Sequence, residues 1–278
     1  MKVRILTSIV GLAVLAVVLC LFDTPVFECA VALICLIAIH ETYKAFDLGR
    51  QGPWIFGGFA VYTLLLIGSA AFQKLLLAPF SFLFVVYLAV CVVGFNRELD
   101  VKSLGGMAAF GVVIWSAFYS FVFIKTCLPS QQYGHEAVFL VLMTLAFAWG
   151  GDSCAYFTGR FLGKHKLAPL VSPNKTVEGA IGGIIGSGVV GVLVTLAARS
   201  ISGFDAGGIF GYLTVFFLGM GCSVLGILGD LFASAVKRQL DIKDYGTIFP
   251  GHGGIMDRFD SVLFIAPLVA LVVWLRTM

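Results

Sequence analysis

Side chains that could do chemistry are concentrated in one stretch near the C-terminal end, SAVKRQLDIKDYGTIFPGHGGIMDRFD from Ser234 to Asp260. Its ionisable residues are Lys237, Arg238, Asp241, Lys243, Asp244, His252, Asp257, Arg258 and Asp260. Lys and Arg bind phosphate, and paired carboxylates bind Mg²⁺. The glycines of Pro-Gly-His-Gly-Gly permit positive φ and a close approach of backbone N–H groups to an anion. The stretch therefore predicts a site for a metal-bound polyphosphate. The alternative is an ordinary solvated loop.

Two more carboxylates lie within or beside apolar segments: Asp230 in GILGDLF and Asp152 in AWGGDSCAYFTGR. A carboxylate at membrane depth is costly unless it is paired or binds a metal. Asp230 is therefore a functional candidate, with simple pairing to a nearby Lys or Arg as the alternative. The same two interpretations apply to Asp152.

A second polar stretch, GRFLGKHKLAPLVSPNKTVEG, runs from Gly159 to Gly179 and carries several cations. The run Ser-Pro-Asn-Lys-Thr before Glu178 predicts a turn followed by the start of a helix, where backbone N–H groups face solvent. The stretch is not a Walker A loop, because the glycine spacing is shorter and His165 replaces the required Ser or Thr. Ordinary positive charge beside a membrane is the alternative interpretation.

The elements that carry these residues must be membrane helices. Of 278 residues, 60% are hydrophobic and 12% charged, and the mean hydropathy is +1.03. Too few polar side chains exist to cover a soluble globule, and a net charge of +3 argues against a bulk electrostatic nucleic-acid binder. We expect an all-α polytopic integral membrane protein of about nine spans. These are Ile5–Phe22, Val26–Ile39, Trp54–Phe72, Leu75–Phe95, Gly105–Ile124, Ala137–Phe157, Glu178–Ala198, Gly207–Leu231 and Phe259–Leu275.

The distribution of Lys and Arg predicts the orientation of these spans. With a cytoplasmic N-terminus, all but four of the 18 Lys and Arg residues fall in cytoplasmic segments. The four in outer segments are Lys74, Lys125, Arg199 and Arg276. The C-terminus should then lie outside, and the two polar stretches become cytoplasmic loops from about Thr158 to Thr176 and from about Phe232 to Arg258.

We expect residues 1–278 to form one integral-membrane domain, with residues 1–135 mainly scaffold and residues 136–278 the catalytic half with its two cytoplasmic loops. His40, Glu41 and Lys44 end the second span and are interpreted as an interfacial cap, with a functional role as the alternative. The seventh span begins GAIGGIIGSGVVG, whose small residues at a spacing of four permit close helix packing. Packing within the chain or at a dimer seam is one interpretation of that stripe, and ion passage is another.

The stretch from Ser234 to Asp260 resembles the signature of the phosphatidate cytidylyltransferases, the CDP-diacylglycerol synthases. The matching residues, all at the family's spacing, are Ser234, Lys237, Arg238, Lys243, Asp244, Gly246, Phe249, Pro250, His252, Gly253, Gly254, Asp257, Arg258 and Asp260. The segments GDSCAYFTGRFLGKHKL and SPNKTVEG are also similar to the family. The resemblance implies a multi-span homodimer that needs Mg²⁺, with K⁺ as a second cation, and that makes CDP-diacylglycerol and pyrophosphate from CTP and phosphatidic acid.

The resemblance also implies roles for individual residues. The metal-binding candidates are Asp230 and Asp257, with Asp260 as a further candidate. The catalytic candidates are Lys237, Arg238, Lys243, Asp244, His252 and Arg258, and the substrate-binding candidates are Arg160, Lys164, Ser172, Lys175, Gly253 and Gly254. We expect an integral protein of a bacterial cytoplasmic (inner) membrane with its active site facing the cytoplasm.

The chemistry agrees with this assignment, because bringing two polyanions together depends on positioning and electrostatic stabilisation. Two alternatives stay open. Another membrane phospholipid transferase is one, although the D-G-x-x-A-R run of the CDP-alcohol phosphotransferases is absent. A secondary transporter of an anionic solute is the other, and it would place its charges near the midplane of inverted halves.

Overall fold

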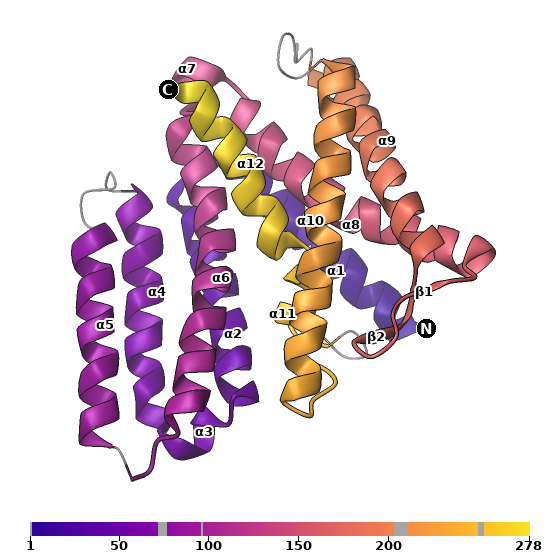
Figure 1. The fold of residues 1–278 in the computed structure, drawn as a ribbon. Coiled ribbons are helices and arrows are strands. Elements are labelled where there is room, and N and C mark those ends of the chain that lie inside the picture. Colours follow the sequence, from indigo (N-terminus) through magenta and orange to yellow (C-terminus); the bar gives the residue numbers. More distant parts are fainter. Residues whose placement is uncertain (1, 72–76, 96, 203–210, 250–252) are drawn as a thin grey trace. The chain divides into compact units, whose positions relative to one another are not determined.

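The computed structural model describes residues 2–71, 77–95, 97–202, 211–249 and 253–278 of the chain, and these are almost entirely helical (Figure 1). They divide into two compact units. The first unit comprises residues 1–126 and 240–259, and the second comprises residues 127–239 and 260–278.

Helices build the first unit: α1 (Lys2–Cys20), α2 (Pro25–Ala45), α3 (Leu48–Gln51), the 3₁₀ helix η1 (Pro53–Ile55), α4 (Phe56–Ala71), α5 (Leu77–Gly94), α6 (Val101–Cys127) and α11 (Met256–Phe259). The second unit contains α7 (Ser130–Tyr133), α8 (Glu136–Leu162), strands β1 (Lys166–Ala168) and β2 (Ser172–Thr176), α9 (Val177–Ser202), α10 (Tyr212–Gln239) and α12 (Val262–Thr277).

Six of the described helices are long and apolar enough to cross a membrane: α2, α5, α6, α8, α9 and α10. Three shorter apolar helical segments, Ile9–Cys20, Pro53–Ser69 and Val262–Thr277, fall where three further spans are expected. On α5 the side chains of Phe82, Leu83 and Val90 are each at least 60% exposed. Such a surface suits hydrocarbon rather than water, so the prediction of an all-α integral membrane protein is confirmed, apart from a short β-hairpin.

Aromatic packing organises the core of the first unit. The ring of Trp115 on α6 lies 4.6 Å from that of Tyr62 and 5.2 Å from that of Phe84, between centroids. Its indole N–H donates to the hydroxyl of the buried Thr63 at 2.8 Å. The contact satisfies both polar groups away from water, as an apolar setting requires.

In the second unit, α8 and α9 pack closely because the small residues of α9 face α8. A Cβ on Gly179 would lie 2.9 Å from the backbone oxygen of Ala155, and one on Gly183 would lie 2.9 Å from the Cβ of Ala155. Larger side chains would force the helices apart. The packing interpretation of the glycine stripe is therefore confirmed within this unit.

The helices extend further than hydropathy predicts. The second span was expected to end at Ile39, but α2 continues to Ala45. The loop expected from about Phe232 begins only after Gln239, because α10 continues for two more turns that carry Lys237 and Arg238. Basic residues are favourable in the last turn of a helix, so polarity alone does not mark the end of α10.

The expected turn at residues 172–176 is wrong. These residues form β2, which pairs antiparallel with β1 through Lys166 opposite Thr176 and Ala168 opposite Ser172. The predicted helix start directly after them is confirmed at Val177, where the Thr176 hydroxyl accepts the N–H of Gly179 at 3.1 Å.

Candidate active site

In the second unit, Asp230 of α10 is engaged by side chains from two elements. Lys175 of β2 forms an ion pair with Asp230 Oδ2, and the Ser234 hydroxyl donates to Asp230 Oδ1 at 3.2 Å. The two side chains of the ion pair are only 26% and 22% exposed. A half-buried, paired carboxylate joins the C-terminal half of α10 to the hairpin that precedes α9, so the structure brings two predicted site residues together.

Further charges surround Asp230 within the same unit. Gly229 allows the chain at Asp260 to approach α10 closely, since a Cβ there would lie 2.6 Å from the Asp260 backbone oxygen. Asp260 lies before α12 begins, and its carboxyl interacts electrostatically with the carboxylates of Asp230 and Asp152 and with the ammonium group of Lys237. Acidic and basic groups therefore lie close together near Asp230, which suits the binding of a cation together with an anion.

Glu178, near the start of α9, fixes the turn that precedes the hairpin. Its carboxylate accepts the backbone N–H of Lys164 at 3.0 Å and bonds the ring of His165 at 2.6 Å. Together with the Thr176 cap, these contacts orient β2, which presents Lys175 to Asp230. Glu178 was not among the expected site residues, although an acidic residue in the first turn of the expected helix is a sequence signal that could have found it.

In the first unit, Asp257 of α11 is held by backbone amides. Its Oδ2 accepts the N–H of Tyr245 at 2.9 Å and the N–H of Gly254 at 3.0 Å, and the residue is only 8% exposed. Gly253 has φ +80°, and a Cβ there would lie 2.8 Å from Asp257 Oδ2. The glycine that the sequence singles out is thus required both for its backbone conformation and for the approach of this carboxylate.

Glu41 corrects one expectation. It does not form an interfacial cap with His40 and Lys44, because it is only 4% exposed and its carboxylate accepts the N–H groups of Ile255 and Met256. Hydropathy does not predict these hydrogen bonds of Glu41, because a carboxylate at the end of an apolar run is normally interpreted as the membrane boundary.

Other predicted site residues have more exposed positions. Arg160 donates to the Tyr156 hydroxyl at 2.9 Å, and Arg238 Nε donates to the Val171 backbone oxygen at 3.3 Å, which ties α10 to the hairpin turn. Ser172 begins β2 and is half-buried. The exposed candidates are Lys164, Lys243, Asp244 and Arg258. His252 lies outside the described residues.

The donor set fits a hard cation that shares its coordination with a nucleotide. Among the residues that the structure describes, no three His, Cys, Asp or Glu side chains converge as a ready-made metal cage. Mg²⁺ seldom uses such cages in nucleotide enzymes, because one or two carboxylates, water and substrate phosphates complete its shell. Asp230 supplies a carboxylate of this kind, and its engagement with Lys175 shows that a positive charge is stabilised at its oxygen.

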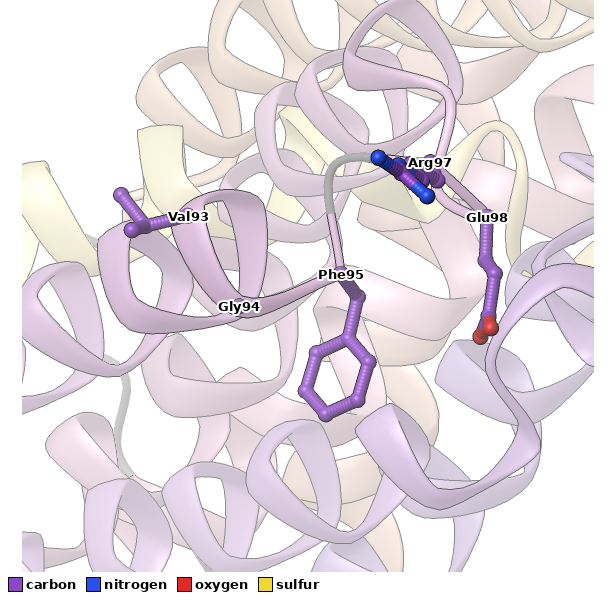
Figure 2. A pocket seen from close by; sticks show the side chains of 5 residues that line it. All are labelled: Val93, Gly94, Phe95, Arg97 and Glu98. Atoms are coloured by element: carbon purple, nitrogen blue, oxygen red, sulfur yellow. The ribbon is translucent and has the colours of Figure 1, made fainter.

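A pocket of about 280 Å³ lies elsewhere in the first unit, where α5 leads into α6 (Figure 2). It is lined by Val93, Gly94, Phe95, Arg97 and Glu98. These residues are not among the candidates for catalysis or metal binding, so this pocket is not the candidate active site.

Comparison with known proteins gives matches over nearly the whole chain. The model of the cytidylyltransferase family matches residues 2–276. The phosphatidate cytidylyltransferase of Bacillus subtilis (strain 168) is 33% identical over 276 residues, which is 97% of this chain and 96% of the relative. That of Staphylococcus haemolyticus (strain JCSC1435) is 33% identical over 275 residues, covering 97% of each chain. That of Staphylococcus aureus (strain COL) is 39% identical over 162 residues, covering 54% of this chain and 59% of the relative.

Proposed function

The chain belongs to the cytidylyltransferase family, and we propose that it transfers the cytidylyl group of CTP to phosphatidic acid, giving CDP-diacylglycerol and pyrophosphate for phospholipid synthesis. The observation that carries this proposal is the match along almost the full chain to two relatives named phosphatidate cytidylyltransferase. The family resemblance inferred from the sequence is thereby confirmed.

The reaction joins two anions. A phosphate oxygen of phosphatidic acid attacks the α-phosphorus of CTP, a new P–O bond forms there, and the bond to the β-phosphate breaks to release pyrophosphate. The attacking oxygen is already ionised and needs little help from a base. Catalysis therefore depends on positioning and on stabilising the charge that develops on the leaving group.

Lys175 is the residue best placed to receive the nucleotide phosphates in the second unit. Its ammonium is paired with Asp230, and β2, the second strand of the hairpin, holds its backbone directly before α9. An arriving polyphosphate offers Lys175 a stronger anionic partner. Lys237, Arg238, Lys243 and Arg258 supply further positive charge, and His252 and Asp244 complete the proposed catalytic set.

Mg²⁺ is proposed as the cofactor and K⁺ as a second cation. Asp230 and Asp257 are each proposed as ligands of Mg²⁺, and Asp260 as a further ligand, because carboxylate oxygens are the donors that hard cations prefer. Bound Mg²⁺ would supply neutralisation of phosphate charge during transfer.

The proposed topology has nine spans with the N-terminus in the cytoplasm of a bacterial cell and the active site on the cytoplasmic side of its inner membrane. Reporter fusions after Arg160 and after Lys243 should both read cytoplasmic, and a fusion after Arg276 should read external. If the fusions after Lys243 and Arg276 report the same side, the ninth span is wrong, and if each reports the side opposite to the one expected, the orientation is wrong. A homodimer is also proposed, and light scattering of the detergent-solubilised protein tests it.

Purified protein with Mg²⁺ and phosphatidic acid tests the reaction when the four nucleotides are compared for pyrophosphate release. We expect release from CTP, with dCTP as a further substrate, only when phosphatidic acid is present. Release from CTP with an alcohol acceptor in place of phosphatidic acid would favour another transferase. Solute uptake into vesicles without pyrophosphate release would favour a transporter.

A further inference from the structure

Glu41 is a buried carboxylate of α2 that contacts a segment more than 200 residues away in the chain. Its Oε1 accepts the N–H of Ile255 at 3.1 Å, and its Oε2 accepts the N–H of Met256 at 2.9 Å. Glu41, Ile255 and Met256 all belong to the first unit, and Met256 is fully buried. Burying a carboxylate costs free energy unless its oxygens accept hydrogen bonds, so the two backbone N–H groups offset the cost of burying Glu41.

Three consecutive amides in this segment are divided between two carboxylates. The N–H of Gly254 donates to Asp257, whereas those of Ile255 and Met256 donate to Glu41. Glu41 therefore holds the backbone directly before Asp257 from one side, while Asp257 holds it from the other.

The position of Glu41 also explains two glycines of the signature. A Cβ added to Gly246 or to Gly254 would overlap the Glu41 carboxylate. Among the described glycines a positive φ occurs only at Gly134 and Gly253, so the requirement at these two positions is space for Glu41 rather than backbone conformation. Two separate parts of the signature, at Gly246 and at Gly254, thus pack against the Glu41 side chain.

A stacked pair supports the same segment. The ring of Tyr245 stacks on Phe110 of α6 with centroids 5.7 Å apart, and the backbone N–H of Tyr245 donates to Asp257. The backbone amides that bond the Asp257 carboxylate therefore belong to a segment that two helices hold in place. Helix α2 contacts this segment through Glu41, and α6 contacts it through Phe110.

We propose that Glu41 is a positioning residue of the transferase reaction, which sets the orientation of Asp257 by clamping the amides of Ile255 and Met256. The proposal rests on the proposed role of Asp257 as a Mg²⁺ ligand. Residues that orient metal ligands affect metal affinity or activity by about 10- to 100-fold when they are changed.

The first test is Glu41→Gln, which keeps the shape of the side chain but has only one carbonyl oxygen to accept hydrogen bonds. The side-chain NH₂ group of glutamine then faces one of the two backbone N–H groups, and two donors oppose each other. We expect the Mg²⁺ concentration for half-maximal activity to rise about 10-fold or more, while KM for CTP at saturating Mg²⁺ changes little. Glu28→Gln is the matched control, because Glu28 lies on the same helix and pairs with Lys125 at 2.7 Å. It should lower thermal stability without moving the Mg²⁺ requirement. Equal Mg²⁺ requirements for Glu41→Gln and the wild type would overturn the proposal.

The second test does not depend on activity. Gly254→Ala should lower the thermal unfolding temperature strongly in the wild-type background, where the new methyl group meets Glu41. In the Glu41→Ala background the same change should cost much less, because the space is then free. If Gly254→Ala lowers the unfolding temperature equally in both backgrounds, Glu41 is not the reason why residue 254 must be glycine, and the proposed contact between Glu41 and this segment is overturned. Should the wild type lack pyrophosphate release from CTP and phosphatidic acid, the proposed function fails, and this second test still decides whether the clamp exists.

Discussion

Asp257 in the first unit and Asp230 in the second are both largely enclosed carboxylates, but different kinds of donor stabilise them. Asp257 accepts two backbone N–H groups at a single oxygen. Asp230 is bonded at both oxygens by side chains, Lys175 at one and Ser234 at the other. Each carboxylate is satisfied, so neither is a defect of the fold.

The difference predicts how each carboxylate responds to its surroundings. Backbone donors cannot be exchanged for a ligand, so the orientation of Asp257 depends on the path of the chain and on the residues that fix it. A lysine can leave one anion for another, so the pairing of Asp230 can change when a polyphosphate arrives. The first unit therefore supplies a rigid carboxylate, and the second supplies one whose partner can be exchanged.

The largest effect is expected from Asp257→Asn and from Asp230→Asn. The N–H groups of Tyr245 and Gly254 both donate to Oδ2, so the carbonyl oxygen of asparagine can keep these two hydrogen bonds while the charge is lost. Each variant should lose activity on the order of 100-fold or more if charge stabilisation dominates. Kinetics of the purified variants over a Mg²⁺ series measure this effect.

Near-normal turnover of Asp257→Asn at low Mg²⁺ would contradict the assignment of Asp257 as a metal ligand. Asp244 and Asp260 would then be the next candidates. Asp230→Asn also leaves Lys175 without its ion-pair partner, so we expect it to change the affinity for CTP, which Asp257→Asn should not do.

A smaller effect is expected from Lys175→Ala. Removing one charged donor from a phosphate site costs about 1.5–3 kcal/mol, which corresponds to an increase in KM for CTP of about 10- to 100-fold. Steady-state kinetics at saturating phosphatidic acid measure this change. Lys166→Ala is the control, since Lys166 is an exposed cation on the same hairpin. Equal KM values for the two variants would assign Lys175 to the general positive charge of cytoplasmic loops.

The smallest effect is expected from Ser234→Ala. It removes one hydrogen bond of 3.2 Å from Asp230 and leaves the ion pair with Lys175 in place. A loss of about 0.5–1.5 kcal/mol would lower kcat/KM by about 2- to 10-fold. A loss as large as that of Asp230→Asn would mean that Ser234, rather than Lys175, governs the carboxylate.

Sequence patterns predicted the membrane helices well, because a long apolar run has few alternatives to a helix in a bilayer. They also single out the signature and Asp230 as candidates, because ionisable residues beside apolar spans are costly and therefore informative. For Asp230 the sequence offers an ion pair only as the alternative to a functional role, and in the structure its ion-pair partner is Lys175, itself a predicted site residue.

The sequence could not predict interactions that depend on tertiary contact. The β2 strand contains Ser, Pro, Asn and Lys, which have no strong strand preference, and it forms because β1 pairs with it. The partners of Glu41 are backbone amides, which have no signature in the sequence. Glu41 and the glycines Gly246 and Gly254 lie far apart in the sequence, so their contact could be recognised only in the structure.

The destination of the α-phosphorus of CTP tests the proposed reaction most directly. CTP labelled at the α-phosphorus is incubated with purified protein, Mg²⁺ and phosphatidic acid, and the lipid phase is extracted. Transfer of the cytidylyl group predicts that the label enters the lipid in proportion to the pyrophosphate released, and that a label on the γ-phosphorus stays in water. Pyrophosphate release without labelled lipid, or lipid labelled from the γ-phosphorus, would contradict it.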